Sequence, residues 1–200
     1  MILELTQAVD RVAQAIDPNE LAFLAMTSKL EFPFRDRLAY ALALAMPNDE
    51  RIAREWNRCD LAWLSGSAPR LLVELKACYS FDLVSQPEIY FGHLRRDLLK
   101  ARILAGPGPA CFAVLMATHL SGPVPAALYD TVKYARGINS AIAKLGTAEH
   151  VRTRAIEEVE RRLSGFCEAK AFQLKFGSYL GISVEVLGWI VGESSTQESA

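Results

Sequence analysis

Two acidic residues and one lysine lie at the ends of two neighbouring apolar runs. Asp60 precedes the first run, and Glu74 and Lys76 follow the second. Between the runs lie residues 65–69, Ser-Gly-Ser-Ala-Pro, whose glycine and proline are typical of a turn. We therefore expect the segment 58–78 to form an antiparallel hairpin that carries its charged residues at one end.

The spacing of these residues also predicts how the hairpin arms pair. Symmetry about a five-residue turn gives three cross-strand pairs: Leu64 with Arg70, Ala62 with Leu72, and Asp60 with Glu74. Side chains that face each other directly have Cβ atoms roughly 5 Å apart, and like charges at that distance destabilise a sheet. Lys76 lies two residues beyond Glu74 and shares its face of the strand, about 6 to 7 Å away. Two acids and one amine should therefore converge.

Two carboxylates beside an amine suit a hard divalent cation. Proteins commonly bind Mg²⁺ through one or two carboxylates, while water and substrate phosphate oxygens complete its coordination. A nearby ammonium group could position or deprotonate an attacking water, or stabilise the charge that develops on phosphorus. The three residues thus point to hydrolysis of a phosphate ester. The competing interpretation is a surface salt bridge at a strand end.

The arrangement resembles the motif of the PD-(D/E)XK nuclease superfamily, in which an Asp, a hairpin turn and a Glu-X-Lys sequence follow one another. The matching residues are Asp60, Glu74, Leu75 and Lys76. The resemblance implies a metal-dependent nuclease that acts on nucleic acid, with DNA as the first expectation, and it permits a homodimer. It also implies that Asp60, Glu74 and the main-chain carbonyl of Leu75 hold Mg²⁺ or Mn²⁺.

The elements expected around the hairpin follow the order helix, three strands, helix, strand. They are predicted at residues 33–45, at 51–56, in the two hairpin arms, at 88–104 and at 110–120. Proline in the first turn of one helix and a Gly-Pro repeat after the other support these boundaries. The order matches a restriction-endonuclease-like core, a mixed sheet flanked by helices of the α/β (α+β) class. It extends the resemblance over about residues 31–120.

In many such nucleases an acidic residue on the first helix joins the metal site. Glu31 is the preferred candidate because it continues the apolar stripe of that helix, although a helix that begins at Pro33 leaves Glu31 just outside it. Asp36 is the second candidate and falls on another face. Either acid could instead favour the helix dipole as an N-terminal charge.

A further acid, Glu55, ends the first strand five residues before Asp60. Many members of the superfamily carry a glutamate there, so the resemblance allows Glu55 a part in the metal site. A salt bridge to Arg54 or Arg58 is the alternative, and the sequence does not separate the two.

Cationic residues follow one face of the helix expected at residues 88–104. His93, Arg96 and Lys100 recur at positions i, i+3 and i+7, apart from the apolar positions that should face the sheet. Some superfamily members carry an Asp-X-X-Lys segment on this helix, which residues 97–100 resemble. The stripe could contact a phosphodiester backbone, or it could be no more than a solvated face.

Composition limits the remaining interpretations. The 200 residues, 51% of them hydrophobic, suffice for a single domain over residues 1–191. With 22 basic and 23 acidic residues, binding to nucleic acid would need a local basic surface. The four cysteines lack zinc-site spacing, which indicates reduced thiols. With no signal peptide and no apolar stretch of membrane length, we expect a cytoplasmic protein.

The flanking regions are predicted to be architectural. Helices are expected at residues 3–16, 18–30, 125–144 and 149–163, a hairpin at 171–186, and a disordered polar tail at 192–200. Two other functions stay open. One is a binding or regulatory module that keeps a nuclease-like fold without turnover. The other is a domain that binds a small molecule or a partner and whose hairpin charges are structural.

Overall fold

A six-stranded mixed sheet with the order β1-β2-β3-β4-β6-β5 forms the centre of the computed structural model, which describes residues 1–164 and 167–193. The strands are β1 (Glu50–Trp56), β2 (Cys59–Ser65), β3 (Ala68–Tyr79), β4 (Ala110–Leu120), β5 (Cys167–Tyr179) and β6 (Ile182–Glu193). The helices are α1 (Ile2–Ala15), α2 (Pro18–Thr27), α3 (Glu31–Ala43), α4 (Ser80–Ser85), α5 (Pro87–Ala105), the 3-10 turn η1 (Ala126–Leu128), α6 (Ala135–Leu145) and α7 (Ala148–Leu163).

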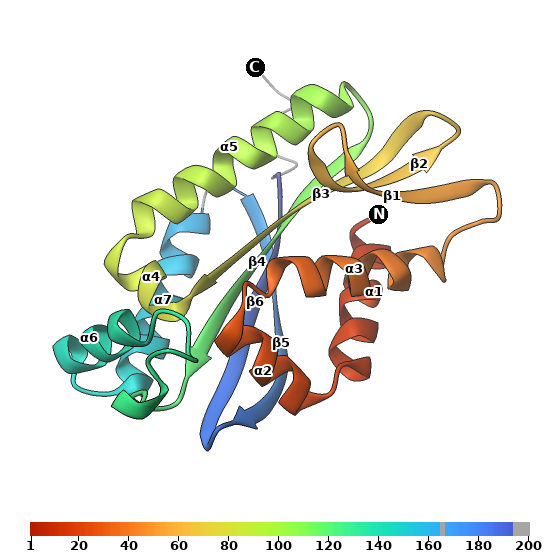
Figure 1. The fold of residues 1–200 in the computed structure, drawn as a ribbon. Helices are drawn as coiled ribbons and strands as arrows, with labels where there is room; N and C mark the ends of the chain where they lie inside the picture. The colour runs from red at the N-terminus through yellow and green to blue at the C-terminus, as the bar shows by residue number, and fades with distance from the viewer. Residues whose placement is uncertain (165–166, 194–200) are drawn as a thin grey trace.

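Strand directions follow from the connections. Tight turns join β1 to β2 and β2 to β3, and both pairs are antiparallel. β3 and β4 are parallel because α5 crosses over between them. β6 then pairs with β4 and β5 in antiparallel fashion. Helices cover both faces of this sheet (Figure 1), so the predicted class, a mixed sheet flanked by helices, is confirmed.

The two faces of the sheet bury separate apolar layers. One layer joins α1, α2 and α3 to the sheet through side chains such as Leu5, Met26 and Phe34, which are fully buried. The other layer lies under α5, where Phe91 and Leu94 pack with Leu115 of β4. Because β3 and β4 lie between these layers, both strands are nearly continuous apolar runs, as expected of parallel strands covered on both sides.

Helix starts follow from local chemistry. The Asp17 carboxylate accepts hydrogen bonds from the main-chain N–H groups of Asn19 and Glu20, and Pro18 occupies the first position of α2. Helix α3 begins at Glu31, two residues earlier than predicted. Pro33 is tolerated there because the first-turn N–H groups have no partner within the helix. Glu31 therefore lies inside the helix.

Other expected elements need correction. The helix predicted at residues 125–144 is divided into η1 and α6, since Tyr134 adopts a left-handed conformation with φ of 60° immediately before α6. Helix α4 was not expected. Strand β6 includes Gly192, which pairs with Phe112 of β4, so the tail predicted from residue 192 begins within a strand. Residues 194–200 lie outside the described residues.

Among the helices of residues 1–164 and 167–193, none is both long and apolar enough to cross a membrane. The side chains of Cys59, Cys78 and Cys111 are buried, as predicted. The side chain of Cys167 is not part of the described structure.

Candidate functional site

The candidate site forms where strand β2 leaves strand β3. Ala62 pairs with Leu72, as predicted. The strand pairing ends at Leu61 with Val73, one residue before the predicted pair of Asp60 and Glu74, whose carboxylates are nevertheless neighbours. The predicted pairing of Leu64 with Arg70 is wrong. Leu64 faces Pro69 instead, because the register shifts after Trp63. This irregularity lies at the turn end of the hairpin, so it does not disturb the charged end.

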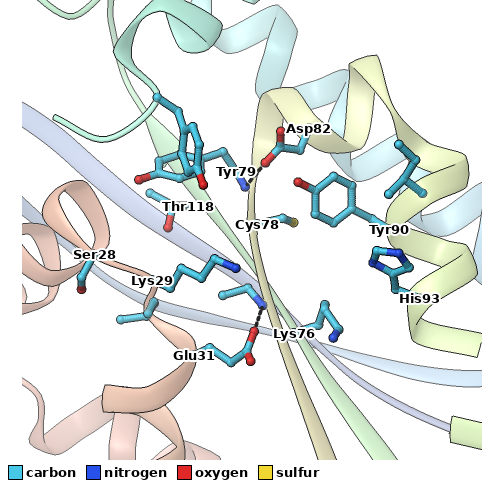
Figure 2. A pocket seen from close by; sticks show the side chains of 14 residues that line it. Ser28, Lys29, Glu31, Lys76, Cys78, Tyr79, Asp82, Tyr90, His93 and Thr118 are labelled. Atoms are coloured by element: carbon cyan, nitrogen blue, oxygen red, sulfur yellow. Dashed lines mark hydrogen bonds between the residues drawn. The ribbon is translucent and has the colours of Figure 1, made fainter. Parts of the chain in front are cut away.

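Beyond Val73, β3 has no strand partner on its β2 side, although its other edge stays paired with β4 as far as Tyr79. Three alternate N–H groups of this open edge donate to carboxylates instead: Leu75 to Asp60 at 2.7 Å, Ala77 to Glu31 at 3.2 Å, and Tyr79 to Asp82 at 2.9 Å. Figure 2 shows the last two contacts. Because partly buried N–H groups need acceptors, the carboxylates replace a missing strand and gather negative charge along one edge.

Glu74 is the most buried acid of the site, with only 5% of its surface exposed. The pKa of Glu74 is raised to about 7, chiefly by burial and also by the neighbouring carboxylate of Asp60, while Lys100 acts in the opposite direction. The two carboxylates predicted to face each other therefore interact strongly. A proton or a cation between them would relieve their repulsion.

Helix α5 completes the site through two ion pairs with β3, which we call the crossed ion pairs. Lys76 Nζ lies 2.8 Å from Asp97 Oδ2, and Lys100 Nζ lies 3.1 Å from Glu74 Oε1. Asp97 and Lys100 are one helical turn apart on α5, and their partners are two residues apart on β3, so each element supplies one acid and one base. Lys100 also donates to the main-chain carbonyl of Arg58, which ties the β1–β2 turn to the site.

Charges of the site control the protonation of Lys76 and Glu31. Burial lowers the pKa of Lys76, but Asp97, Glu31 and Asp60 together outweigh it and hold the pKa above its ordinary value. Lys76 is therefore a cation at neutral pH. Burial raises the pKa of Glu31, and the charge of Asp60 adds to this effect. Glu31, the acid predicted from the first helix, thus lies within electrostatic reach of Lys76 and Asp60.

Two other candidate acids lie away from this cluster. The Asp36 carboxylate lies 3.2 Å from Arg35 and 3.1 Å from Arg54. Glu55 pairs with Arg35 at 2.8 Å rather than with Arg54 or Arg58, the partners that the sequence offered as the alternative to a part in the metal site. The left-handed backbone of Glu55, with φ of 56°, turns the end of β1 at this point. Arg35, which is buried, therefore holds both acids in a structural cluster beside α3.

The cationic stripe expected on α5 is divided in the structure. His93 lines a pocket beside the site, and Figure 2 shows it near Lys76. Lys100 is turned to Glu74, and Arg96 is exposed. His93 thus faces the pocket and Lys100 faces Glu74, whereas Arg96 is open to solvent.

Only some of the residues expected to bind a divalent cation are arranged as ligands. Within residues 1–164 and 167–193, no three His, Cys, Asp or Glu side chains are grouped as they would be around a metal ion. Glu31 and Asp60 each accept a main-chain hydrogen bond instead. However, Mg²⁺ needs only one or two protein carboxylates. The pKa of Glu74 is raised mainly by burial and also by the charge of Asp60, so the two carboxylates lie close together. The pair Asp60 and Glu74 thus meets the requirement.

Sequence reasoning missed Asp97 and Asp82 as members of the site. Asp97 stands three residues before Lys100, a spacing that places both on one helix face. That spacing was a signal for the crossed ion pairs. Asp82 belongs to the unexpected helix α4, where its carboxylate caps the helix start by accepting a hydrogen bond from the main-chain N–H of Tyr79.

No family model, no curated protein and no solved structure matches this chain. The functional argument therefore depends on the geometry of the site.

Proposed function

We propose that this protein is a metal-dependent nuclease that hydrolyses phosphodiester bonds of nucleic acid, with DNA as the first expectation, on a restriction-endonuclease-like core of the PD-(D/E)XK type. One observation carries the proposal: where β2 separates from β3, Asp60 lies beside Glu74 and within electrostatic reach of Lys76. The order α3, β1, β2, β3, α5, β4 agrees with that core.

Asp60, Glu74 and the main-chain carbonyl of Leu75 would hold Mg²⁺ or Mn²⁺, with Glu31 as a further acid nearby. In an extended strand the N–H and C=O of one residue point to the same side. The hydrogen bond from Leu75 to Asp60 therefore directs the Leu75 carbonyl toward the same open edge. When bound, the ion would act as a Lewis acid toward the phosphate oxygens.

The side chains of the site would divide the remaining work. Lys76 stays protonated at neutral pH, so it donates hydrogen bonds to the attacking water or to a phosphate oxygen and stabilises the developing charge. Asp97 holds the ammonium group of Lys76 in place. Lys100 offsets the charge of Glu74 and favours its ionised form. Lys76 thus acts as a donor rather than as a base.

Cleavage of defined substrates tests this proposal. Wild type is incubated with plasmid DNA and with single- and double-stranded DNA and RNA oligonucleotides in the presence of Mg²⁺ or Mn²⁺. Lys76→Ala should reduce cleavage at least about 100-fold while circular dichroism shows an unchanged fold. Lys144→Ala, which removes an exposed lysine of α6, is the matched control and should cleave normally. Full activity of Lys76→Ala would refute the mechanism.

A binding or regulatory module without turnover is the second candidate. The crossed ion pairs favour it, because Lys76 and Glu74 already have partners of opposite charge. In that case Mg²⁺ or Mn²⁺ would raise the unfolding midpoint, yet none of these substrates would be cleaved. Cleavage that Lys76→Ala abolishes would rule this candidate out.

A further inference from the structure

A pocket of about 270 Å³ opens beside the candidate site. Its floor is the end of β3 from Lys76 to Tyr79, and Glu31 and Lys76 belong to both the pocket and the site (Figure 2). A strand rises about 3.3 Å per residue, so this floor begins roughly 7 Å from Glu74 and ends roughly 17 Å from it. A group bound in the pocket would therefore adjoin a phosphate held at the site.

The pocket walls come from segments far apart in the sequence. Figure 2 shows Tyr90 and His93 projecting from α5 on one side, and Lys29 reaching in from the segment between α2 and α3 on the other. Tyr134 adds a further ring, which meets the ring of Tyr79 edge to face with their centroids 5.5 Å apart. Aromatic side chains thus contribute much of the lining.

Tyr134 has two features that suit contact with a ligand. Its backbone is left-handed, with φ of 60°, a conformation that non-glycine residues rarely adopt and that is enriched where proteins contact ligands. Its side chain nevertheless stays 51% exposed, with Lys133 Nζ 5.4 Å from the ring centroid. The Tyr134 ring is therefore exposed at the pocket, and packing in the core does not explain its unusual backbone conformation.

Charge and size indicate what the pocket can hold. The cations Lys29 and Lys76 are matched by the acids Glu31 and Asp82, so the pocket has no excess positive charge for a phosphate group. It offers ring faces and hydrogen-bonding groups, among them the Thr118 hydroxyl and the Asp82 carboxylate. The volume of about 270 Å³ has room for several waters and is large enough for one planar ring system.

We propose that this pocket receives one unpaired nucleotide of the nucleic-acid substrate, with its base against the tyrosine rings and its phosphate at Asp60 and Glu74. The inference rests on the proposed function of that site and specifies the substrate class: single strands, or duplexes with an unpaired nucleotide. Stacking on aromatic rings tolerates any sequence. It also lets a chain with a net charge of −1 bind nucleic acid without an extended basic surface.

Binding without cleavage tests the pocket. Fluorescence anisotropy in EDTA, and again with Ca²⁺, compares a fully paired 20-mer duplex, the same duplex with one bulged nucleotide, and a single strand. Wild type should bind the bulged duplex and the single strand more tightly than the paired duplex. Loss of one stacked base by alanine substitution corresponds to between about fivefold and about a hundredfold in affinity.

Substitutions of Tyr134 test whether its aromatic ring causes the binding preference. Tyr134→Ala should remove the preference for unpaired nucleotides, whereas Tyr134→Phe, which keeps the ring, should retain it. Tyr40→Ala removes an exposed tyrosine of α3 outside the pocket and is the control. A wild type that binds all three probes equally or none of them, or a Tyr134→Ala variant that keeps the preference, would overturn the inference.

These results separate the pocket from the nuclease proposal. A binding preference that depends on Tyr134, without cleavage under any metal condition, would support the pocket and reject the nuclease. Cleavage that depends on Lys76 but is equal for paired and unpaired substrates, with no binding preference, would support the nuclease and reject the pocket.

Discussion

The carboxylate of Asp97 lies 2.8 Å from the ammonium nitrogen of Lys76 and connects helix α5 to strand β3 within the candidate site. Both side chains are partly buried, with 25% of Lys76 and 19% of Asp97 exposed. Together with the contact between Lys100 and Glu74, this pair fixes how far α5 lies from the open end of the hairpin. Five predictions follow from the site and from the packing around it.

Asp97→Asn should lower the pKa of Lys76, because Asp97 provides the largest of the contributions that raise it. The folded-state pKa of Lys76 exceeds its ordinary value of 10.5, so the stabilisation is complete below 10.5 and is lost as the pH rises through the higher folded value. NMR titration of labelled lysines measures this shift directly. At pH 7 the variant should lose about 1 kcal/mol or less. Glu157→Gln, which breaks an exposed pair on α7, is the control. An unchanged Lys76 titration would contradict the assignment.

Glu74→Gln should stabilise the protein in alkaline solution when divalent cations are absent. The pKa of Glu74 is raised to about 7, so its favourable contribution is present below the ordinary value of 4.5 and is lost as the pH rises through about 7. We expect the variant to gain about 1–3 kcal/mol over wild type at pH 8 and little at pH 5. Urea unfolding at both pH values measures the difference. An equal difference at the two pH values would show that Glu74 is not the group that titrates.

Stabilisation of the wild type by metal should increase as the pH rises. Binding of Mg²⁺ or Mn²⁺ requires the ionised form of Glu74, whose pKa is about 7. Millimolar metal should therefore raise the unfolding midpoint more at pH 8 than at pH 6, by mass action on the folded state. Glu74→Ala should lose the shift, while Glu157→Ala should keep it. A shift that survives in Glu74→Ala would place the metal elsewhere.

Substitutions of Asp60 separate its role in stability from its role in metal binding. Asp60→Ala leaves the N–H of Leu75 without an acceptor and should cost about 1–3 kcal/mol. Asp60→Asn keeps an acceptor oxygen, so it should stay folded while it loses the midpoint shift with Mg²⁺. If the charge of Asp60 is only structural, Asp60→Asn will match or exceed wild type in stability, with no effect of metal on either protein.

Gly177→Ala should disrupt the contact between α2 and β5. A Cβ atom at residue 177 would lie 1.7 Å from the carbonyl oxygen of Pro18, so the helix must move. Such overpacking costs about 1–3 kcal/mol or more. Gly92→Ala is the matched control, because its Cβ would meet no atom within 4 Å, and alanine should stabilise α5 by about 0.5–1 kcal/mol. Thermal unfolding of both variants checks the prediction, and equal midpoints would contradict it.

Local patterns were sufficient to predict the hairpin and most elements around it. Apolar runs and turn chemistry located β2 and β3, and symmetry about the turn gave the pairing of Ala62 with Leu72. The bulge after Trp63 was not predictable, because symmetry about a turn assumes that the two arms have equal numbers of residues between paired positions. The division of 125–144 into two short elements depends on the left-handed Tyr134, whose side chain packs on Tyr79, a contact between distant segments.

The partners of the site residues depend on three-dimensional position. Spacing alone brought Asp60, Glu74 and Lys76 together, and periodicity along α3 selected Glu31. The same periodicity could not show that Glu31 meets the N–H of Ala77, since the two residues are 46 positions apart and the contact exists only because β2 diverges from β3. Glu55 was left open between the metal site and the nearby arginines for the same reason, and its partner Arg35 comes from another element.

The contact between α2 and β5 affects how this chain is made. Asn19 Oδ1 accepts a hydrogen bond from the main-chain N–H of Ser178, 159 residues later, and Phe23 meets Tyr179 edge to face with ring centroids 5.1 Å apart. At about 5–20 residues per second, α2 leaves the ribosome roughly 8 to 30 seconds before its partner strand. During that interval Leu21 and Met26, both buried in the finished protein, lack the strand they will cover. Nascent chains that stall before β5 should therefore be clients of chaperones that bind exposed apolar helices.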